Sequence, residues 1–372
     1  MKQLAILNKI AADTMNSSIR PKALSKSKPR SLATASKTRI IAGLALCVLL
    51  CIISLCASVA WGARSVSFDF VLAHFGLLGS TQDFADAQTF SNIIDARIPR
   101  TFFGFLAGAS LGVAGALMQA ITRNPIADPS ILGVNTGASL FVVIGIAYFH
   151  IQSGMSYLLL AFVGASITAL AVYGLASIGQ GGASPMKLAL AGAAASTALQ
   201  ALVNAIMLPN SQVMDQFRFW QVGSTGGASW EDIHTLLPCL LIGLALAFWL
   251  AQGLNTLALG DEMAASLGLK VQRCRALAAL AAILLCASCT ALAGPIAFVG
   301  LMVPHAMRII FGPNMKLLLP FSALSGASLL LIADVIGRLS GGPSELEVGI
   351  VTALMGAPVF IAIVRKLRLR SL

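Results

Sequence analysis

Long apolar stretches separated by short polar segments follow one another along most of this chain. Ten of them approach the length of a membrane-spanning helix: 40–61, 101–121, 131–149, 157–178, 187–208, 235–252, 276–293, 297–311, 317–337 and 348–364. A helix of about 20 apolar residues crosses a hydrocarbon core of roughly 30 Å, so 131–149 and 297–311 are marginal. The pattern predicts an all-α polytopic membrane bundle of about ten transmembrane helices.

The segment 101–121 also indicates how its helix packs. It contains no charged residue, and Gly104, Gly108, Gly112 and Ala116 recur every four residues. Such positions share one side of a helix and form a smooth stripe that lets another helix backbone approach closely. We expect this helix to be packed inside the bundle and to be broken by the two prolines of the polar turn NPIADP at 124–129.

Composition leads to the same class of protein. The chain is 57% hydrophobic and only 10% charged, and its mean hydropathy is +0.86. A soluble domain of this composition would lack the polar surface needed to stay dispersed. Residues 39–372 are therefore predicted to form the transmembrane domain, whereas residues 1–38 are basic, rich in Ser and Lys, and predicted to be a disordered arm.

The distribution of charge predicts the orientation in the membrane. With a cytoplasmic N-terminus, only Arg64, Arg97, Arg100, Arg218 and Arg338 of the 25 Lys and Arg residues lie outside, and the other 20 lie inside. Cytoplasmic loops are enriched in Lys and Arg, so both termini are expected in the cytoplasm. The basic arm would then contribute to topology or contact anionic lipid.

Residues that could carry chemistry are sparse. The chain has seven cysteines, but Cys286-x-x-Cys289 has neither a second pair nor a nearby His, so we expect packing residues and no metal site. No P-loop or hydrolase motif occurs, which argues against an enzyme and places any ATPase on another polypeptide. The predicted spans also lack the acids or histidines at mid-membrane that an ion-coupled secondary transporter would use.

Several segments carry a family resemblance. RIPR at 97–100 precedes the second predicted helix, GALMQ at 115–119 lies within it, and the NPIADP turn follows. GPIAFVGLMVPHAMR at 294–308, ADVIGR at 333–338 and ELEVGIVTALMGAPVF at 345–360 come later. In this order they resemble the FecCD-type permeases, the membrane subunits of bacterial ABC importers for ferric siderophores, haem, cobalamin and similar chelates, and look closest to permeases of the ferric-enterobactin type.

The resemblance implies a type II ABC importer permease that moves a ferric siderophore across the bacterial cytoplasmic (inner) membrane. Haem, cobalamin or molybdate are the alternative cargoes. The implied partners are two ABC ATPase subunits, a second permease subunit that is identical or related, and a periplasmic or lipid-anchored binding protein. This chain would bind no cofactor, and ATP and Mg would bind to the ATPase.

By the same resemblance, Arg97, Arg100 and Arg338 would receive acidic side chains of the binding protein. Asp334 lies about 27 Å along a helix that starts near Lys316, at 1.5 Å per residue, and so close to the outer surface. It is four residues before Arg338 and can pair with it. The alternative is that these arginines snorkel or contact lipid phosphates.

The segment 260–275, GDEMAASLGLKVQRCR, is predicted to form a short helix. Asp261 and Glu262 lie near its start, where negative charge suits the helix dipole, and Gly268 lies at its end. The segment resembles the ATPase coupling loop of ABC importers, with matching positions Glu262, Ala264, Ala265, Leu267 and Gly268. The alternative is an ordinary capped connector.

The cargo pathway is predicted from two further segments. The turn 179–187, with Ser184 and Pro185, is the candidate inner gate, and Ser196, Gln200 and Asn204 on the following helix are candidate pathway residues, although residues of these types equally serve packing. The segment 213–224 carries Phe217, Phe219 and Trp220 beside Arg218. Aromatic faces and one cation at the pathway mouth would suit an anionic aromatic chelate, while an interfacial anchor is the alternative.

Overall fold

The computed structural model describes residues 37–368 except 78, 80, 82–83, 85, 152, 180–182 and 341–344. Helices joined by loops make up the described residues, which contain no strand. In chain order they are α2 (Lys37–Ala60), α3 (Phe68–His74), α4 (Ala87–Thr122), the 3-10 helix η2 (Pro129–Leu132), α5 (Val134–Phe149), α6 (Gly154–Ser177), α7 (Pro185–Met207), α8 (Ser211–Gln221), α9 (Trp230–Leu257), α10 (Asp261–Ser266), α11 (Val271–Ala293), α12 (Val299–Phe311), α13 (Met315–Ser340) and α14 (Val348–Arg368). The all-α class is confirmed, and the predicted basic arm lies outside the described residues apart from its last two.

All ten predicted spans coincide with helices. Seven of these, α2, α4, α6, α7, α9, α11 and α13, are long and apolar enough to cross a membrane, and α5, α12 and α14 are shorter apolar helices. The predicted starts are too late for α4, which begins at Ala87, and for α9, which begins at Trp230. Hydropathy marks the apolar part of a helix, whereas the first turns of both helices carry polar and charged side chains.

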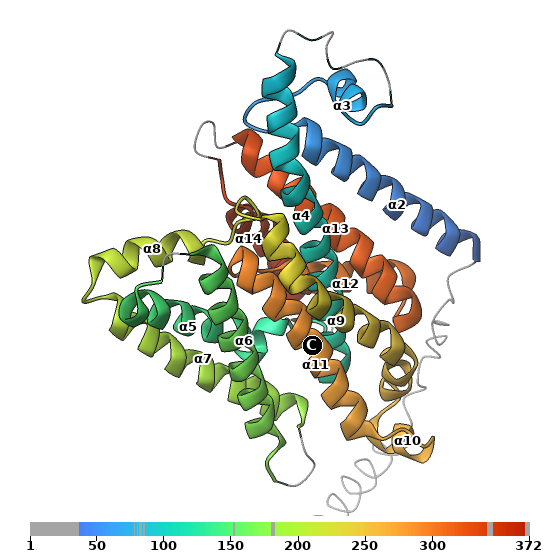
Figure 1. The fold of residues 1–372 in the computed structure, drawn as a ribbon. Coiled ribbons are helices and arrows are strands. Elements are labelled where there is room, and N and C mark those ends of the chain that lie inside the picture. Colours follow the sequence, from blue (N-terminus) through green and yellow to red (C-terminus); the bar gives the residue numbers. More distant parts are fainter. Residues whose placement is uncertain are drawn as a thin grey trace, which may run out of the picture. The chain divides into compact units, whose positions relative to one another are not determined.

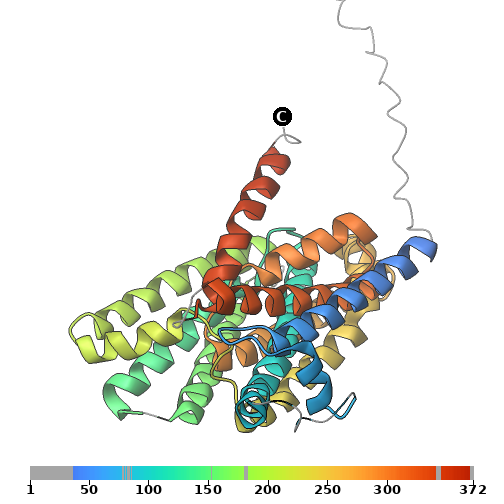
Figure 2. The same ribbon diagram turned by 90° about the horizontal axis from the view of Figure 1, so that it is seen from above.

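Helix α4 runs through the bundle, with α13, α11 and α12 packed against it (Figure 1). Figure 1 places α3 near one end of α4 and α10 near the other. Helices α5, α6, α7 and α8 lie together on one side, and α14 projects from the rest in the view of Figure 2. Because α4 is surrounded by other helices, it can join polar groups from many parts of the chain.

The small-residue stripe of α4 packs against α13, as predicted. A Cβ atom added to Gly108 would lie 2.4 Å from the carbonyl oxygen of Gly326, and one added to Gly112 would lie 2.3 Å from that of Ser322. Real Cβ atoms do not approach this closely, so only glycine permits this crossing of the two helices. The close crossing brings the first half of α4 next to the last turns of α13.

Helix α4 ends where its sequence turns polar. Arg123 has a left-handed backbone conformation with φ 49°. The Asn124 side chain then accepts a hydrogen bond from the Ile126 amide at 3.1 Å, and Asp128 Oδ1 accepts one from the Ser130 amide at 2.9 Å. Asp128 thereby caps η2, and burial raises the pKa of its carboxyl group. The predicted break after α4 is confirmed, and it leaves Arg123 at the very end of the helix.

Candidate functional site

Charged side chains gather at two places along α4. Arg100 and Arg123 are 23 residues apart in sequence, or about 34 Å at 1.5 Å per residue. We call the group around Arg100 the Asp334 cluster, and it comprises Arg97, Arg100, Thr225, Asp334, Arg338 and Glu345. We call the group around Arg123 the Asp261 clamp, and it comprises Arg123, Asp261 and Arg275.

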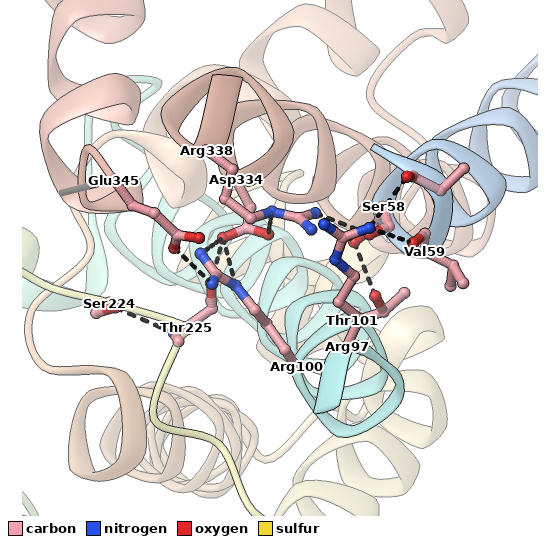
Figure 3. Close-up of polar contacts among 12 residues, drawn as sticks. Ser58, Val59, Arg97, Arg100, Thr101, Ser224, Thr225, Asp334, Arg338 and Glu345 are labelled. Atoms are coloured by element: carbon pink, nitrogen blue, oxygen red, sulfur yellow. Dashed lines mark hydrogen bonds and ion pairs between the residues drawn. The ribbon is translucent and has the colours of Figure 1, made fainter. Parts of the chain in front are cut away.

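Asp334 is the centre of the first cluster (Figure 3). It is only 3% exposed and accepts hydrogen bonds from Arg100 Nε at 3.1 Å, Arg100 Nη2 at 2.8 Å and Thr225 Oγ1 at 2.7 Å. Arg338 Nε lies 3.0 Å from its other carboxylate oxygen, so the predicted Asp334–Arg338 pairing is confirmed. Arg100 Nη1 also contacts Glu345 at 2.8 Å. One buried carboxylate therefore joins α4, α13 and the loop before α9.

Arg97 and Arg338 are directed toward the end of α2. Arg97 donates from Nη1 to the carbonyl oxygens of Val59 and Ala60 at 2.9 and 3.0 Å, and Arg338 donates from Nη2 to that of Ser58 at 2.9 Å. The last carbonyls of a helix have no partner within it and carry the negative end of its dipole. The last turn of α2 has no basic residue of its own, so two arginines from other helices cap it.

The expectation of three arginines exposed on the outer face is wrong for two of them. Arg97 and Arg338 are buried, because both bind carbonyls at the end of α2 and Arg338 also pairs with the buried Asp334 carboxylate. Arg100 and Glu345 are the more accessible members of the cluster. The role of the arginines in docking a binding protein stays a prediction. Thr225 and Glu345 were missed from the sequence, because nothing local marks them.

The Asp261 clamp ties α10 to α4, α9 and α11. Arg275 Nη2 lies 3.1 and 3.2 Å from the two carboxylate oxygens of Asp261. Arg123 Nη2 binds the same carboxylate and also donates to the Leu257 carbonyl at 2.8 Å. Arg275 Nη1 donates to the carbonyl oxygen of Ala183 at 3.2 Å. From the sequence both arginines could be predicted only as cytoplasmic charge, since Asp261 is 138 residues from Arg123 and Ala183 is 92 residues from Arg275.

A short helix, α10, forms within the predicted segment 260–275, but it ends at Ser266, and residues 271–275 belong to α11. Gly268 has φ +84°, its amide binds the Ala265 carbonyl at 2.9 Å, and the Leu269 amide binds that of Ala264 at 3.0 Å. This is a Schellman motif, which explains the glycine. Ala264 is buried, whereas Glu262, Ala265 and Leu267 are exposed. An open groove of about 730 Å³, lined by Arg123, residues 259–263 and Ser266, lies beside the helix.

Two of the five predicted gate or pathway residues line a cavity of about 420 Å³. Ser184 and Pro185, at the start of α7, face it together with Thr122, Asn124, Ala127 and Ile131. Ser184 also caps α7 by accepting a bond from the Lys187 amide at 3.4 Å. Residues 180–182 of the predicted gate turn lie outside the described residues.

The other three predicted pathway residues lie farther along α7 and do not line this cavity. Ser196 lies 3.4 Å from the Thr136 hydroxyl, and Gln200 donates to Asn204 at 3.2 Å. The Ser196 hydroxyl, which contacts α5, fits the packing alternative, whereas the Gln200–Asn204 pair is exposed and lies along α7 itself. Whether these residues contact cargo stays a prediction.

The aromatic mouth predicted on α8 differs from the structure. Phe217 is fully buried and stacks on Trp220 with ring centroids 5.8 Å apart, so its face is closed to a ligand. Arg218 instead lines an open cavity of about 750 Å³ with Ile350, Leu354 and other residues of α14. The apolar face of α8 packs into the bundle, which leaves its polar side toward that cavity.

Within the described residues, no three His, Cys, Asp or Glu side chains are arranged to hold a metal ion. Cys286 and Cys289 belong to the buried core. Cys289 Sγ lies 3.7 Å from the carbonyl oxygen of Ala107 on α4. Both cysteines therefore pack between helices.

Comparison with known proteins places this arrangement in context. The chain matches the FecCD transport family over residues 49–366. It is 45% identical to the ferric enterobactin transport system permease protein FepD of Escherichia coli (strain K12) over 86% of this chain and 93% of that protein. It is 39% identical to the probable siderophore transport system permease protein YfiZ of Bacillus subtilis (strain 168), over 86% and 96% of the two chains. A solved inward-facing structure of a metal-chelate type ABC transporter superposes with a TM-score of 0.74 at 28% identity, covering 88% of this chain and 99% of that one.

Proposed function

Because this chain belongs to the FecCD transport family, we propose that it is the permease subunit of a binding-protein-dependent ABC importer that moves a ferric siderophore across the bacterial inner membrane. The observation that supports a ferric siderophore as the cargo is the 45% identity to a ferric enterobactin permease, over 86% of this chain and 93% of that protein. The chain is a multi-pass membrane protein. It is a permease rather than an enzyme, and we propose that ATP and Mg bind to separate ATPase subunits.

We propose that α10 is the docking element for one of two ATPase subunits. Leu259, Met263 and Leu267 are exposed large apolar side chains on or beside this short helix, next to the open groove of about 730 Å³. Exposed apolar side chains at the end of a bundle, away from lipid, are typical of a protein contact. Glu262 would lie at the rim of that contact.

The binding protein would dock at the opposite end, on the Asp334 cluster. Arg100 and Glu345 offer the accessible charges there, while Arg97 and Arg338 would hold the end of α2 in place beneath them. Charge of this kind steers and orients a partner. A second permease subunit, identical or related, would cover the exposed faces of α7 and α14.

The proposed orientation in the membrane assigns the Asp334 cluster to the outer face and α10 to the cytoplasmic face. Arg64, Arg97, Arg100 and Arg338 would be outside, and α10 with the clamp arginines inside, so that both termini are cytoplasmic. Cargo would leave past the cavity at the start of α7, with Ser184 and Pro185 at the gate and Ser196, Gln200 and Asn204 farther along α7.

Uptake in cells that lack only this gene tests the proposal. We expect loss of labelled ferric siderophore uptake and unchanged uptake of haem, cobalamin and molybdate, with full recovery when the gene is returned. Unchanged siderophore uptake with loss of another substrate would refute the cargo. Siderophore uptake that requires this gene but persists without the ATPase subunit would instead indicate a secondary transporter.

A further inference from the structure

Arg275 joins two segments that the proposed function assigns to different tasks. Its side chain is 2% exposed although it lies near the start of α11. One terminal nitrogen binds both oxygens of Asp261, the first residue of α10, and the other binds the carbonyl oxygen of Ala183. Ala183 directly precedes Ser184, the N-cap of α7. A single guanidinium therefore connects the short helix α10 with the start of α7.

Asp261 is linked through two arginines to two of the segments that line the cavity beside Ser184. Through Arg275 it is joined to the start of α7, which supplies one wall. Through Arg123 it is joined to the end of α4, where Thr122 and Asn124 also line the cavity. A displacement of α10 thus acts on the start of α7 and the end of α4 at once.

We propose that Arg275 is a positioning residue that transmits movement of α10 to the start of α7 and so sets the width of this cavity. A guanidinium is planar and holds two acceptors in a fixed geometry. A buried cation cannot leave its partners without a large penalty. Asp261 and Ala183 must consequently move together with Arg275.

The inference rests on the proposed function, in which an ATPase moves α10. It extends that function by naming the residue that relays the movement. A residue that only stabilises the fold would lower the stability of the complex and leave the stoichiometry of transport unchanged. Cargo transported per ATP hydrolysed therefore separates the two roles.

The first experiment uses the full permease with its ATPase and binding protein in proteoliposomes. It measures ferric siderophore transport and ATP hydrolysis in the same preparation. Arg275→Met should leave ATPase co-purification and hydrolysis in place. It should lower transport per ATP by about tenfold, a typical size for the loss of coupling between two sites, because movement of α10 would no longer reach the start of α7. Arg275→Lys should give an intermediate ratio, because one ammonium group cannot hold both acceptors. The matched control is Arg273→Met, which removes an exposed arginine two residues away on α11.

The second experiment follows the cavity itself. Met186 lines the cavity wall on α7 and is exposed, so Met186→Cys can be labelled with a maleimide, with the chain lacking this substitution as background. ATP should change the labelling rate in the otherwise unaltered permease and should no longer change it with Arg275→Met. If Arg275→Met fails to accumulate, Asp261→Ala provides the same test, because it removes the carboxylate that joins α10 to Arg275 and Asp261 is 46% exposed. Retained ATPase co-purification by this variant shows that docking itself is intact.

The outcomes separate the two proposals. The relay is overturned if the unaltered complex imports siderophore and Arg275→Met keeps both the normal transport ratio and ATP-dependent labelling. The proposed importer function would then still stand. Failure of the unaltered chain to bind an ATPase or to import siderophore overturns the proposed function, and the relay falls with it.

Discussion

Replacing Asp334 with Asn should be among the most destabilising single changes at the Asp334 cluster. Asp334 Oδ1 accepts from Arg100 and Thr225, and Oδ2 faces Arg338 Nε at 3.0 Å. In Asp334→Asn the amide oxygen can replace only one of these carboxylate oxygens. The amide nitrogen then faces the N–H of Arg338, and two arginines lose their buried counter-charge.

The burial of these side chains sets the size of the effect. Asp334 and Arg338 are 3% and 2% exposed, and removing one partner of such a buried pair costs about 3–5 kcal/mol. Glu345 also pairs with Arg100, but it is 36% exposed, so Glu345→Gln should cost at most about 1 kcal/mol. The two variants should differ by at least about 2 kcal/mol, or roughly thirtyfold in the unfolding equilibrium constant.

A denaturant titration of the purified permease in detergent micelles, followed by tryptophan fluorescence, measures this difference. Adding Arg338→Met to Asp334→Asn removes the orphaned cation, so the double variant should recover part of the lost free energy of unfolding. Equal effects of Asp334→Asn and Glu345→Gln, or no recovery in the double variant, would show that the buried pair does not hold these helices together.

Two further substitutions test the packing of α4 and the docking of α10. Gly112→Ala would place a Cβ 2.3 Å from the Ser322 carbonyl, where ordinary contact begins at 3.4 Å. We expect a loss of about 1–3 kcal/mol from this overpacking, whereas Gly174→Ala on α6, with nothing within 4 Å, should be neutral or gain up to about 1 kcal/mol. The same denaturant titration measures both variants. Equal stabilities of Gly112→Ala and Gly174→Ala would contradict the close approach of α4 and α13 at Gly112. Leu267→Ser should abolish ATPase co-purification without lowering stability, while Leu77→Ser, an equally exposed leucine near α3, should have no effect on it; retention of the ATPase by Leu267→Ser would exclude this docking surface.

Local pattern predicted much of the fold. The apolar stretches predicted ten helices, the four-residue spacing of small residues in α4 predicted its close packing, and the Asn-Pro turn predicted its end. The spacing of Asp334 and Arg338 predicted their ion pair, and Gly268 marked the end of α10. Each of these features depends on residues within a few positions of one another, so periodicity and turn chemistry are sufficient to find them.

The contacts of the arginines were not predictable in this way. Arg100 and Asp334 are separated by 234 residues, Arg123 and Asp261 by 138, and Arg275 and Ala183 by 92. The sequence predicted that Arg97 and Arg338 face outward, because hydropathy shows only that a charge lies near the end of a span. It does not show that the end of another helix lies beside that charge and needs a cap.

By itself the sequence determined that this chain crosses the membrane many times, that the helix at 101–121 is packed inside and ends at the Asn-Pro turn, and which family the chain belongs to. These properties depend on composition and on the spacing of nearby residues, and they do not depend on which helices pack against each other. Only the tertiary structure decided that Asp334 is shared by α4 and α13, that two arginines close the end of α2, and that Arg275 joins α10 to α7. A buried charge must find a partner, and which partner it finds depends on how distant helices pack.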